Sequence, residues 1–396
     1  MSYHLSKAVA AIENCNAPLS YDAWRRRIHI DAPCDWGSEP GLWEKSDLTK
    51  FELWMQRAKG CGTQKAESKR AVLHCAQKCS FDPLGQYMTS IVWDGKPRID
   101  RFIKDYAGGV EKDCLGLGDK PGDADRYMSA IGRMWLISGA ARALLWESGG
   151  CQVDTMLVLE GAQGAGKSTA FRILGGEFFR DTKIAIGTTE GARILQGAFV
   201  YEWGEMSAMS GRDIGDVKDY ITRICDDYRH LYEEDITSHP RRCIFGGTTN
   251  SYEYLLDKSG ARRFLCVRVG IPDIDALIRD RDQLWAEAVA RFRDGEKWHV
   301  TDPVEAAIIQ RHQGLRAVAD LWELRIVELV EHLPEVSTEA IAIRLGLLTP
   351  DGIGKLSPGS TRRIAEIMPR LGFEGGGGIR VKYGTRRVRG YRRLAA

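Results

Sequence analysis

The spacing of apolar and polar residues changes along the chain, and each change predicts a different kind of structure. Within the first 80 residues, apolar positions recur at three- and four-residue steps over 48–58, which predicts a helix among loops. Residues 81–150 predict a helical lead-in that contains a long helix over 125–146. In residues 151–270, short apolar runs alternate with helical stretches, as in parallel strands joined by crossover helices. The pattern therefore predicts an α/β core with a parallel sheet, preceded by a mostly helical N-terminal region.

The end of the chain predicts a small separate domain. After helical residues up to about 325, the segment 336–346 predicts a helix capped by Ser337 or Thr338, and 361–371 predicts a second helix. Residues 379–391 then alternate basic and apolar side chains, as the strands of a wing do. Helix, turn, helix and basic ribbon are the order of a winged helix. We therefore expect four regions: 1–80, 81–150, the core 151–325 and the winged helix 335–396.

Charge is distributed unevenly and favours a nucleic-acid contact at this end of the chain. The net charge is +2, but residues 355–396 hold 11 Lys and Arg against 2 Glu, a balance of +9 that leaves −7 for the residues before them. Lys and Arg displace the counterions condensed on nucleic-acid phosphates. In a winged helix, Arg362 and Arg363 would contact bases, and the wing residues would contact the backbone: Arg386, Arg387 and Arg389. A small packing domain with a basic face is the alternative.

Composition excludes several classes of protein. Apolar residues make up 43% and charged residues 28% of the 396 residues, which excludes whole-chain disorder and fibrous repeats. No apolar stretch approaches the roughly 18 residues of a membrane span, and the N-terminus lacks the apolar core of a signal peptide. A cytoplasmic protein without a membrane partner is expected. The ten cysteines form no Cys-x-x-Cys pair, and His74, Cys75 and Cys79 are too few for a zinc site, so reduced thiols are expected.

The strongest chemical signal runs from Gly161 to Ser168, Gly-Ala-Gln-Gly-Ala-Gly-Lys-Ser, and matches the phosphate loop G-x-x-x-x-G-K-[ST] at every position. An apolar run over 155–160 predicts a buried strand before it, and a helix follows. Glycines let successive N–H groups point at phosphate oxygens, Lys167 reaches the β- and γ-phosphates, and Ser168 takes a position on Mg²⁺. ATP and Mg²⁺ are therefore expected, held by Gly161, Gln163, Gly164, Ala165, Gly166, Lys167, Ser168 and Thr169.

Two later strands predict the acids and the polar group that ATP hydrolysis requires. The run 198–205 ends in carboxylates, of which Glu202 is expected on the metal side and Glu205 beside the attacking water, with these two roles interchangeable. The run 243–250 ends in Thr-Thr-Asn, where Asn250 would contact the γ-phosphate or the water. Two rim carboxylates and an ordinary turn are the competing interpretations.

Arginines after these strands are candidates for contacts with a neighbouring subunit. Arg262 and Arg263 follow a turn, and one of them is a candidate arginine finger, since guanidinium groups stabilise charge on a transferring phosphate. Arg223 and the pair Arg241 and Arg242 are further candidates. Surface ion pairs are the alternative for about half of these arginines.

The segment 228–241 predicts a hairpin with an acidic tip. In ring ATPases a hairpin at this position can enter the pore and touch nucleic acid. The three consecutive acids at 233–235 argue against a phosphate contact at the tip. Arg229, His230 and His239 are therefore the candidates for a DNA contact.

In this order, the motifs resemble the virulence-associated protein E family of phage and genomic-island P-loop ATPases, which is similar to superfamily 3 replicative helicases. The resemblance covers residues 80–270 and rests on 93–98 (Trp-Asp-Gly-Lys-Pro-Arg), 157–161, Tyr201-Glu202-x-x-Glu205, 218–223 (Lys-Asp-Tyr-Ile-Thr-Arg), 247–250 and 260–264. The family pattern usually has Asn where this chain has Ala261. The resemblance implies an AAA+-type core, a homo-hexameric ring and a role for Lys218. The first 80 residues are too few for a primase domain, so any primase is expected to be a separate partner.

The leading interpretation is an ATP-driven replicative DNA helicase or replication initiator of phage or mobile-element type. It would hold single-stranded DNA in a ring pore and duplex DNA on the winged helix. An ATP-gated DNA-binding regulator or loader without unwinding activity is the alternative. A packaging or nuclease-associated motor is a third class, but the sequence shows no acidic cluster typical of a nuclease. The first two classes both require Lys167 and a basic domain, so the sequence does not separate them.

Overall fold

The computed structural model describes residues 3–111, 120–206, 211–229, 235–250, 263–314, 321–349, 356–383 and 385–394. The chain forms two compact units, Met1–Arg316 and Ala317–Ala396, and each has its own hydrophobic core. Two of the predicted site residues, His230 and Arg262, lie outside the described residues, as does Ala261.

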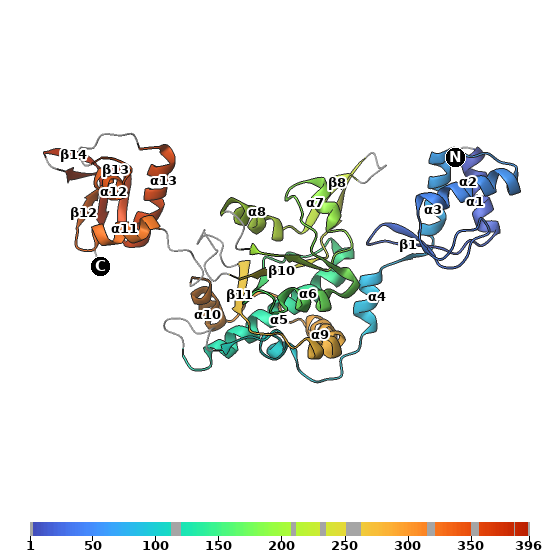
Figure 1. Cartoon of the computed structure of the whole chain (residues 1–396), viewed down its shortest axis with the longest axis horizontal. Helices are drawn as coiled ribbons and strands as arrows, with labels where there is room; N and C mark the ends of the chain where they lie inside the picture. Colours follow the sequence, from blue (N-terminus) through green and yellow to red (C-terminus); the bar gives the residue numbers. More distant parts are fainter. Residues whose placement is uncertain are drawn as a thin grey trace. The chain divides into compact units, whose positions relative to one another are not determined.

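A parallel sheet lies at the centre of the first unit (Figure 1). Its strand order is β11-β5-β10-β7-β6, and every adjacent pair of strands is parallel. The chain leaves β5 toward one edge of the sheet and returns on its other side as β11, so the strand order reverses at β5. Ligands bind outside the carboxyl ends of strands at such points. The strands are β5 Met156–Glu160, β6 Phe179–Arg180, β7 Val200–Trp203, β10 Ile244–Thr249 and β11 Phe264–Arg268.

Helices cover both faces of this sheet, which confirms the predicted mixed α/β core. Leu157 and Leu159 of β5 pack in the cluster that includes α5, α6 and α9, whereas Met156 and Val158 pack in the cluster that includes α8. Figure 1 shows these helices on the two sides of the sheet. No described helix is both long and apolar enough to cross a bilayer. The helices are α4 Pro83–Ser90, α5 Asp123–Leu144, α6 Lys167–Gly175, α7 Thr189–Ile194, α8 Gly211–Ile221, α9 Ile274–Arg293 and α10 Pro303–Gly314.

The N-terminal region contains a sheet that the hydrophobic periodicity does not reveal. Its strand order is β3-β2-β1-β4, with β1 antiparallel to β2 and parallel to β4. The strands hold only two to four residues, too few for an alternating pattern to stand out. The expectation of helix and loop alone is therefore wrong, while the predicted helix over 48–58 is confirmed as part of α2. The elements are α1 Tyr3–Asn14, β1 Leu19–Asp22, β2 Arg27–Ile30, β3 Gly41–Leu42, α2 Lys45–Lys59, α3 Lys65–Gln77 and β4 Ser80–Phe81.

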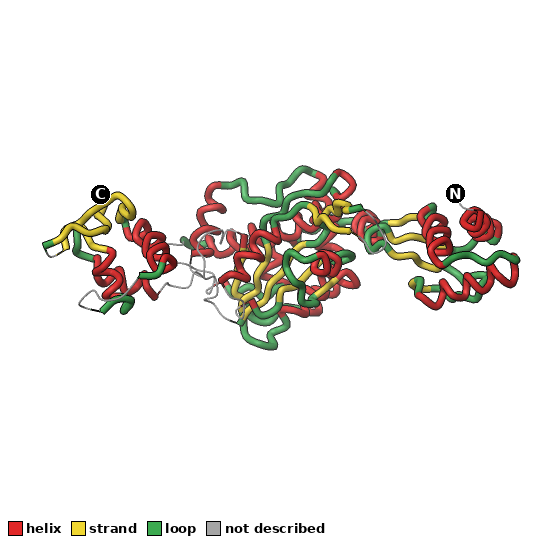
Figure 2. Tube along the Cα trace, turned by 90° about the horizontal axis from the view of Figure 1, so that it is seen from above, coloured by secondary structure: helices red, strands yellow, loops and turns green. Residues whose placement is uncertain are grey.

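Among the residues described in the second unit, the α-helices α11, α12 and α13 combine with an antiparallel sheet of order β12-β14-β13, drawn in red and yellow in Figure 2. Ser337 caps α12 by accepting the Ala340 N–H at 3.0 Å, as predicted. The second predicted helix is confirmed with different bounds: it begins at Pro358, because Ser357 caps it, and its α-helical part ends at Ile367, before a 3-10 helix over Met368–Leu371. The elements are α11 Leu321–Val330, β12 Glu335–Ser337, α12 Thr338–Arg344, α13 Pro358–Ile367, β13 Phe373–Tyr383 and β14 Arg386–Arg393.

Candidate functional site

The loop between β5 and α6 is built around glycines. Gly164 and Gly166 have φ angles of 75° and 96°, in the left-handed region that favours glycine. A Cβ atom on Gly161 would lie 2.4 Å from the Val269 carbonyl oxygen, so the close approach of the neighbouring backbone requires glycine there as well. The loop ends where α6 begins at Lys167, and the first N–H groups of that helix have no intrahelical acceptor.

Lys167 points back into this loop. Its Nζ donates to the carbonyls of Gly161 and Ala162, each at 2.7 Å, and to Oδ1 of Asn250 at 3.1 Å. The side chain is buried, and burial lowers the pKa of Lys167, although the Glu202 carboxylate nearby opposes this effect. Asn250 follows β10 directly, so two strands of the sheet meet at one ammonium group.

A carboxylate lies beside the first turn of α6. The Ser168 hydroxyl donates to Oε1 of Glu202 at 2.5 Å, and the Thr248 hydroxyl donates to the same oxygen at 2.9 Å. Glu202 is only 3% exposed and sits in β7, while Thr248 sits in β10. The sequence signal at Thr-Thr-Asn points to Asn250 and misses Thr248; the position of Thr248 near the end of a strand is the clue that could have found it.

Glu205 lies two residues past the end of β7. It is exposed and has a φ angle of 52°, an uncommon conformation for a residue other than glycine. Such outliers persist only where the surrounding structure fixes them and are frequent at functional sites. The structure thus gives Glu202 and Glu205 different environments: one buried and hydrogen-bonded, the other open to solvent.

The hydrogen-bond donors and acceptors at this edge of the sheet fit a nucleoside triphosphate with Mg²⁺. Free helical N–H groups and an ammonium suit phosphate oxygens, and a hydroxyl beside a carboxylate suits a hard cation. Within the described ranges, no three His, Cys, Asp or Glu side chains gather as a metal site. Mg²⁺ is usually held by one or two carboxylates, with phosphate oxygens and water as its other ligands, so the single carboxylate of Glu202 fits this ion.

Two of the candidate arginines are structural. The Arg241 guanidinium forms a buried ion pair with Asp226, and Arg242 pairs with both carboxylate oxygens of Asp82 at 2.7 and 2.8 Å. Both side chains are at most 2% exposed, so neither is available as an arginine finger. Arg263 lies directly before β11.

The predicted hairpin forms from β8 (Cys225–Arg229) and β9 (Ile236–Pro240), which are antiparallel. Arg229 is exposed at its tip side. His239 is held near the base, where Nε2 lies 2.9 Å from the Thr237 hydroxyl and the ring lies 4.3 Å from that of Tyr228.

The basic residues of the second unit lie on its surface. Arg362 and Arg363 are exposed in the first turns of α13, and the Arg363 guanidinium lies 4.5 Å from the Trp322 ring centre. The wing candidates are exposed on β14: Arg386, Arg387 and Arg389.

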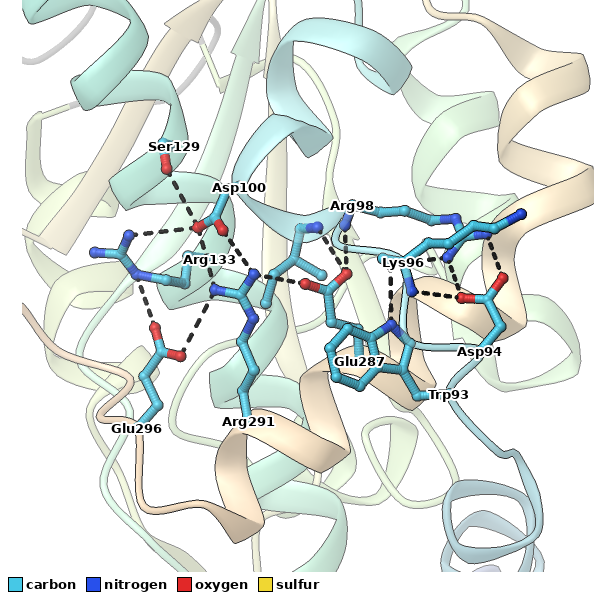
Figure 3. A network of polar contacts seen from close by, with 11 residues as sticks. Trp93, Asp94, Lys96, Arg98, Asp100, Ser129, Arg133, Glu287, Arg291 and Glu296 are labelled. Atoms are coloured by element: carbon cyan, nitrogen blue, oxygen red, sulfur yellow. Dashed lines mark hydrogen bonds and ion pairs between the residues drawn. The ribbon is translucent and has the colours of Figure 1, made fainter.

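The segment 93–98 fastens the lead-in to α9 rather than joining the candidate site (Figure 3). Asp94 forms an ion pair with Arg98 at 2.7 Å, and the Trp93 indole donates to the Lys96 carbonyl. The Arg98 and Ile99 N–H groups donate to Oε2 of Glu287, which is fully buried on α9, at 2.5 and 3.0 Å. Lys218, which the family resemblance adds to the site, is buried on α8.

Comparison with solved structures gives similarities over nearly the whole chain at low identity. One apo structure of the NrS-1 C-terminal region is 13% identical with a TM-score of 0.47, covering 98% of this chain and 99% of that one. A second, its A form, is 12% identical with a TM-score of 0.48 and the same coverage. No curated protein matches the sequence. The model of the virulence-associated protein E-like domain matches residues 88–317, more than half of the chain, which therefore belongs to this family.

Proposed function

We propose that this protein is a DNA-dependent ATPase of the replicative helicase type, which hydrolyses ATP with Mg²⁺ and moves along DNA as a ring. One observation carries the proposal: groups from α6, from β7 and from the end of β10 and the residue after it converge on the glycine loop, at the point where the strand order of the sheet reverses. They are Lys167, Ser168, Glu202, Thr248 and Asn250. Because they come from positions up to 83 residues apart, their convergence is a property of the fold.

Each residue has a distinct task in this proposal. The loop amides and Lys167 hold the β- and γ-phosphates, and Ser168 and Glu202 hold Mg²⁺, which neutralises phosphate charge when bound. Glu205, which is open to solvent, orients the attacking water and accepts its proton. Asn250 contacts the γ-phosphate, and Arg262 or Arg263 reaches the site of a neighbouring subunit.

DNA is the proposed polymer. In the second unit, α12, α13 and the ribbon β13–β14 have the order of a winged helix, and residues 355–396 carry a balance of +9. In the first unit, Arg229, His230 and His239 of the hairpin are the proposed contacts with single-stranded DNA in the pore. Replication of a phage or mobile element, with a separate primase, is the proposed setting.

An ATP-gated DNA-binding regulator is the second candidate function. The separate core of the second unit favours it, because a DNA-binding unit that folds by itself can act without a translocating ring. In that case nucleotide binding would change DNA affinity, and turnover would be slow.

The test is ATP hydrolysis without DNA, with single-stranded DNA and with duplex DNA, using Lys167→Ala as the control. Strong stimulation by single strands that the variant lacks is the result expected of a translocating helicase. Slow hydrolysis that is indifferent to DNA, together with nucleotide-dependent duplex binding, would favour the regulator. Equal hydrolysis by the variant and the parent would contradict both functions.

A further inference from the structure

A basic groove lies where the N-terminal region meets the parallel-sheet core. Arg25 and Arg26 line it from the turn between β1 and β2, Arg27 lines it from the start of β2, and Arg180 and Arg193 line it from the core. With Glu177 and Glu190 as the only carboxylates among its described lining residues, the groove carries a formal charge of +3 with His29 neutral. Its volume is about 980 Å³. This charge stands out because the chain before residue 355 is acidic overall.

Contacts between the N-terminal region and the parallel-sheet core hold the walls of this groove in place. The Trp24 ring packs on Phe178 with their centres 5.1 Å apart, and the Trp24 carbonyl accepts from the Gln196 amide at 3.2 Å. Arg25 lies 2.9 Å from Glu177 and stacks on the Phe178 ring at 4.8 Å. The β1–β2 turn is thereby held against the core, so its arginines and those of the core face one space.

Carboxylates balance only part of the charge. Arg25 is paired with Glu177 and Asp22, and Arg193 is 3.9 Å from Glu190. Arg27 is exposed at the start of β2 and makes no ion pair with any residue that the structure describes.

Arg180 lies near the positive charges of Arg25 and Arg27, which outweigh the nearby carboxylates of Glu177 and Asp181. Its guanidinium donates to the carbonyls of Glu177 and Phe179, at 3.0 and 2.6 Å, rather than to a carboxylate. Burial, followed by the positive charges of Arg25 and Arg27, lowers the pKa of Arg180. The fold thus holds like charges close together, and a bound anion would relieve their repulsion.

The groove continues to the hairpin. It shares Arg26 and Gln196 with an adjoining pocket of about 260 Å³, which His239 lines from the base of the hairpin and Tyr228 lines from β8. A strand that contacts His239 therefore has a basic path toward the N-terminal region.

We propose that this groove binds the phosphate backbone of single-stranded DNA. The inference rests on the proposed DNA function and extends its DNA path beyond the hairpin. Guanidinium groups spread along an open groove match the repeating phosphates of a strand and read no sequence.

The test is binding of the full chain to fluorescent oligo-dT over a range of salt concentrations. Removing one arginine that binds a phosphate of a single strand reduces the slope of log K against log salt by about 0.7, or roughly fivefold in affinity at 0.1 M salt. Arg27→Ala should reduce the slope by about 0.7. The double variant Arg27→Ala with Arg180→Ala should reduce it by about twice that amount. Arg279→Ala is the matched control, because Arg279 is exposed on α9 and outside the groove, and it should keep the parent slope.

Several outcomes would overturn the inference. If the parent binds oligo-dT and folded groove variants keep its slope, the groove is not a DNA site, although the proposed function stands. If the parent does not bind, both fail. If the groove variants lose affinity only for duplex DNA, the groove binds a duplex. If they change the oligomeric state and leave DNA binding unchanged, the groove is an interface with a second copy of the chain. Should the double variant lose its thermal transition, Arg27→Glu at the exposed position decides the matter, with a loss larger than that of Arg27→Ala expected.

Discussion

At the scale of single residues, Glu202 is held in place before any ligand arrives. Two hydroxyl groups, from Ser168 and Thr248, donate to one of its carboxylate oxygens. Groups that orient a metal ligand in this way commonly change metal affinity 10- to 100-fold when they are removed. Glu205, by contrast, is exposed to solvent and has an uncommon backbone conformation. These environments lead to separate expectations for the two acids.

Glu205→Gln should bind ATP and hydrolyse it about 100- to 10,000-fold more slowly, because a general base typically contributes that much. Glu202→Gln should instead raise the Mg²⁺ concentration needed for nucleotide binding. Single-turnover hydrolysis and fluorescent-nucleotide binding across Mg²⁺ concentrations separate the two effects. Normal hydrolysis in Glu205→Gln would transfer the role of the base to Glu202.

Thr248→Val should raise the half-saturating Mg²⁺ concentration about tenfold, because valine keeps the shape but lacks the hydroxyl that orients Glu202. Thr248→Ser keeps the hydroxyl and is the matched control. If serine and valine behave alike, packing rather than the hydrogen bond explains the effect.

At the scale of elements, the contacts of the 93–98 segment join the lead-in to α9. Glu287 is fully buried and accepts hydrogen bonds from two backbone N–H groups and from Arg291. Glu287→Ala leaves the two backbone N–H groups without an acceptor, while Arg291 keeps Asp100 as a partner, so we expect a loss of about 3 kcal/mol of stability. Thermal unfolding measures it. Glu296→Ala, at a partly exposed ion pair with Arg133, should cost less than about 1 kcal/mol, and equal losses would contradict the account.

The same region should weaken in acid. Burial opposes the ionisation of Asp100, but its hydrogen bond and ion pair with Arg291, aided by Arg133, outweigh burial and lower the pKa of Asp100. A carboxyl whose pKa is lowered by folding stabilises the fold above its ordinary pKa of about 4, and that contribution is lost as the pH falls through the lowered value. Asp100→Asn should therefore be less stable than the parent at pH 7, and the melting temperatures of the two should converge toward pH 3. Parallel curves would contradict the prediction.

The sequence predicts some of these elements well and others poorly, for physical reasons. The strand β5 is buried on both faces and so appears as a continuous apolar run, and the glycine loop after it has a fixed spacing. The short strands β1–β4 carry too few residues for a periodic signal. Arg241 and Arg242 look like free cations in sequence because their partners, Asp226 and Asp82, are set by tertiary structure. The triplet Arg25-Arg26-Arg27 is visible in the sequence, but the sequence does not show that it lines the same groove as Arg180.

At the scale of the whole molecule, the proposed ATP hydrolysis belongs to the first unit and the proposed duplex binding to the second. A chain that ends at residue 316 retains the glycine loop and every group described around it, so we expect it to hydrolyse ATP without DNA at about the parent rate. It lacks the basic block of residues 355–396, so its duplex binding should fall and its salt slope should decrease by about 0.9 for each phosphate that the block neutralises. Hydrolysis rates and duplex titrations check both statements. Undiminished duplex affinity would remove the proposed winged helix from the DNA interface.

The position of Lys167 means that the nucleotide-free protein and the ATP complex compete for one ammonium group. Two carbonyls and an amide oxygen already occupy its three protons, so an arriving phosphate substitutes for these partners instead of filling an idle donor. In the nucleotide-free protein, Lys167 therefore links the glycine loop to Asn250, in addition to its proposed role in phosphate binding. Lys167→Ala would therefore loosen the empty loop in addition to weakening phosphate binding, and amide hydrogen exchange in the loop of the nucleotide-free variant should be faster than in the parent.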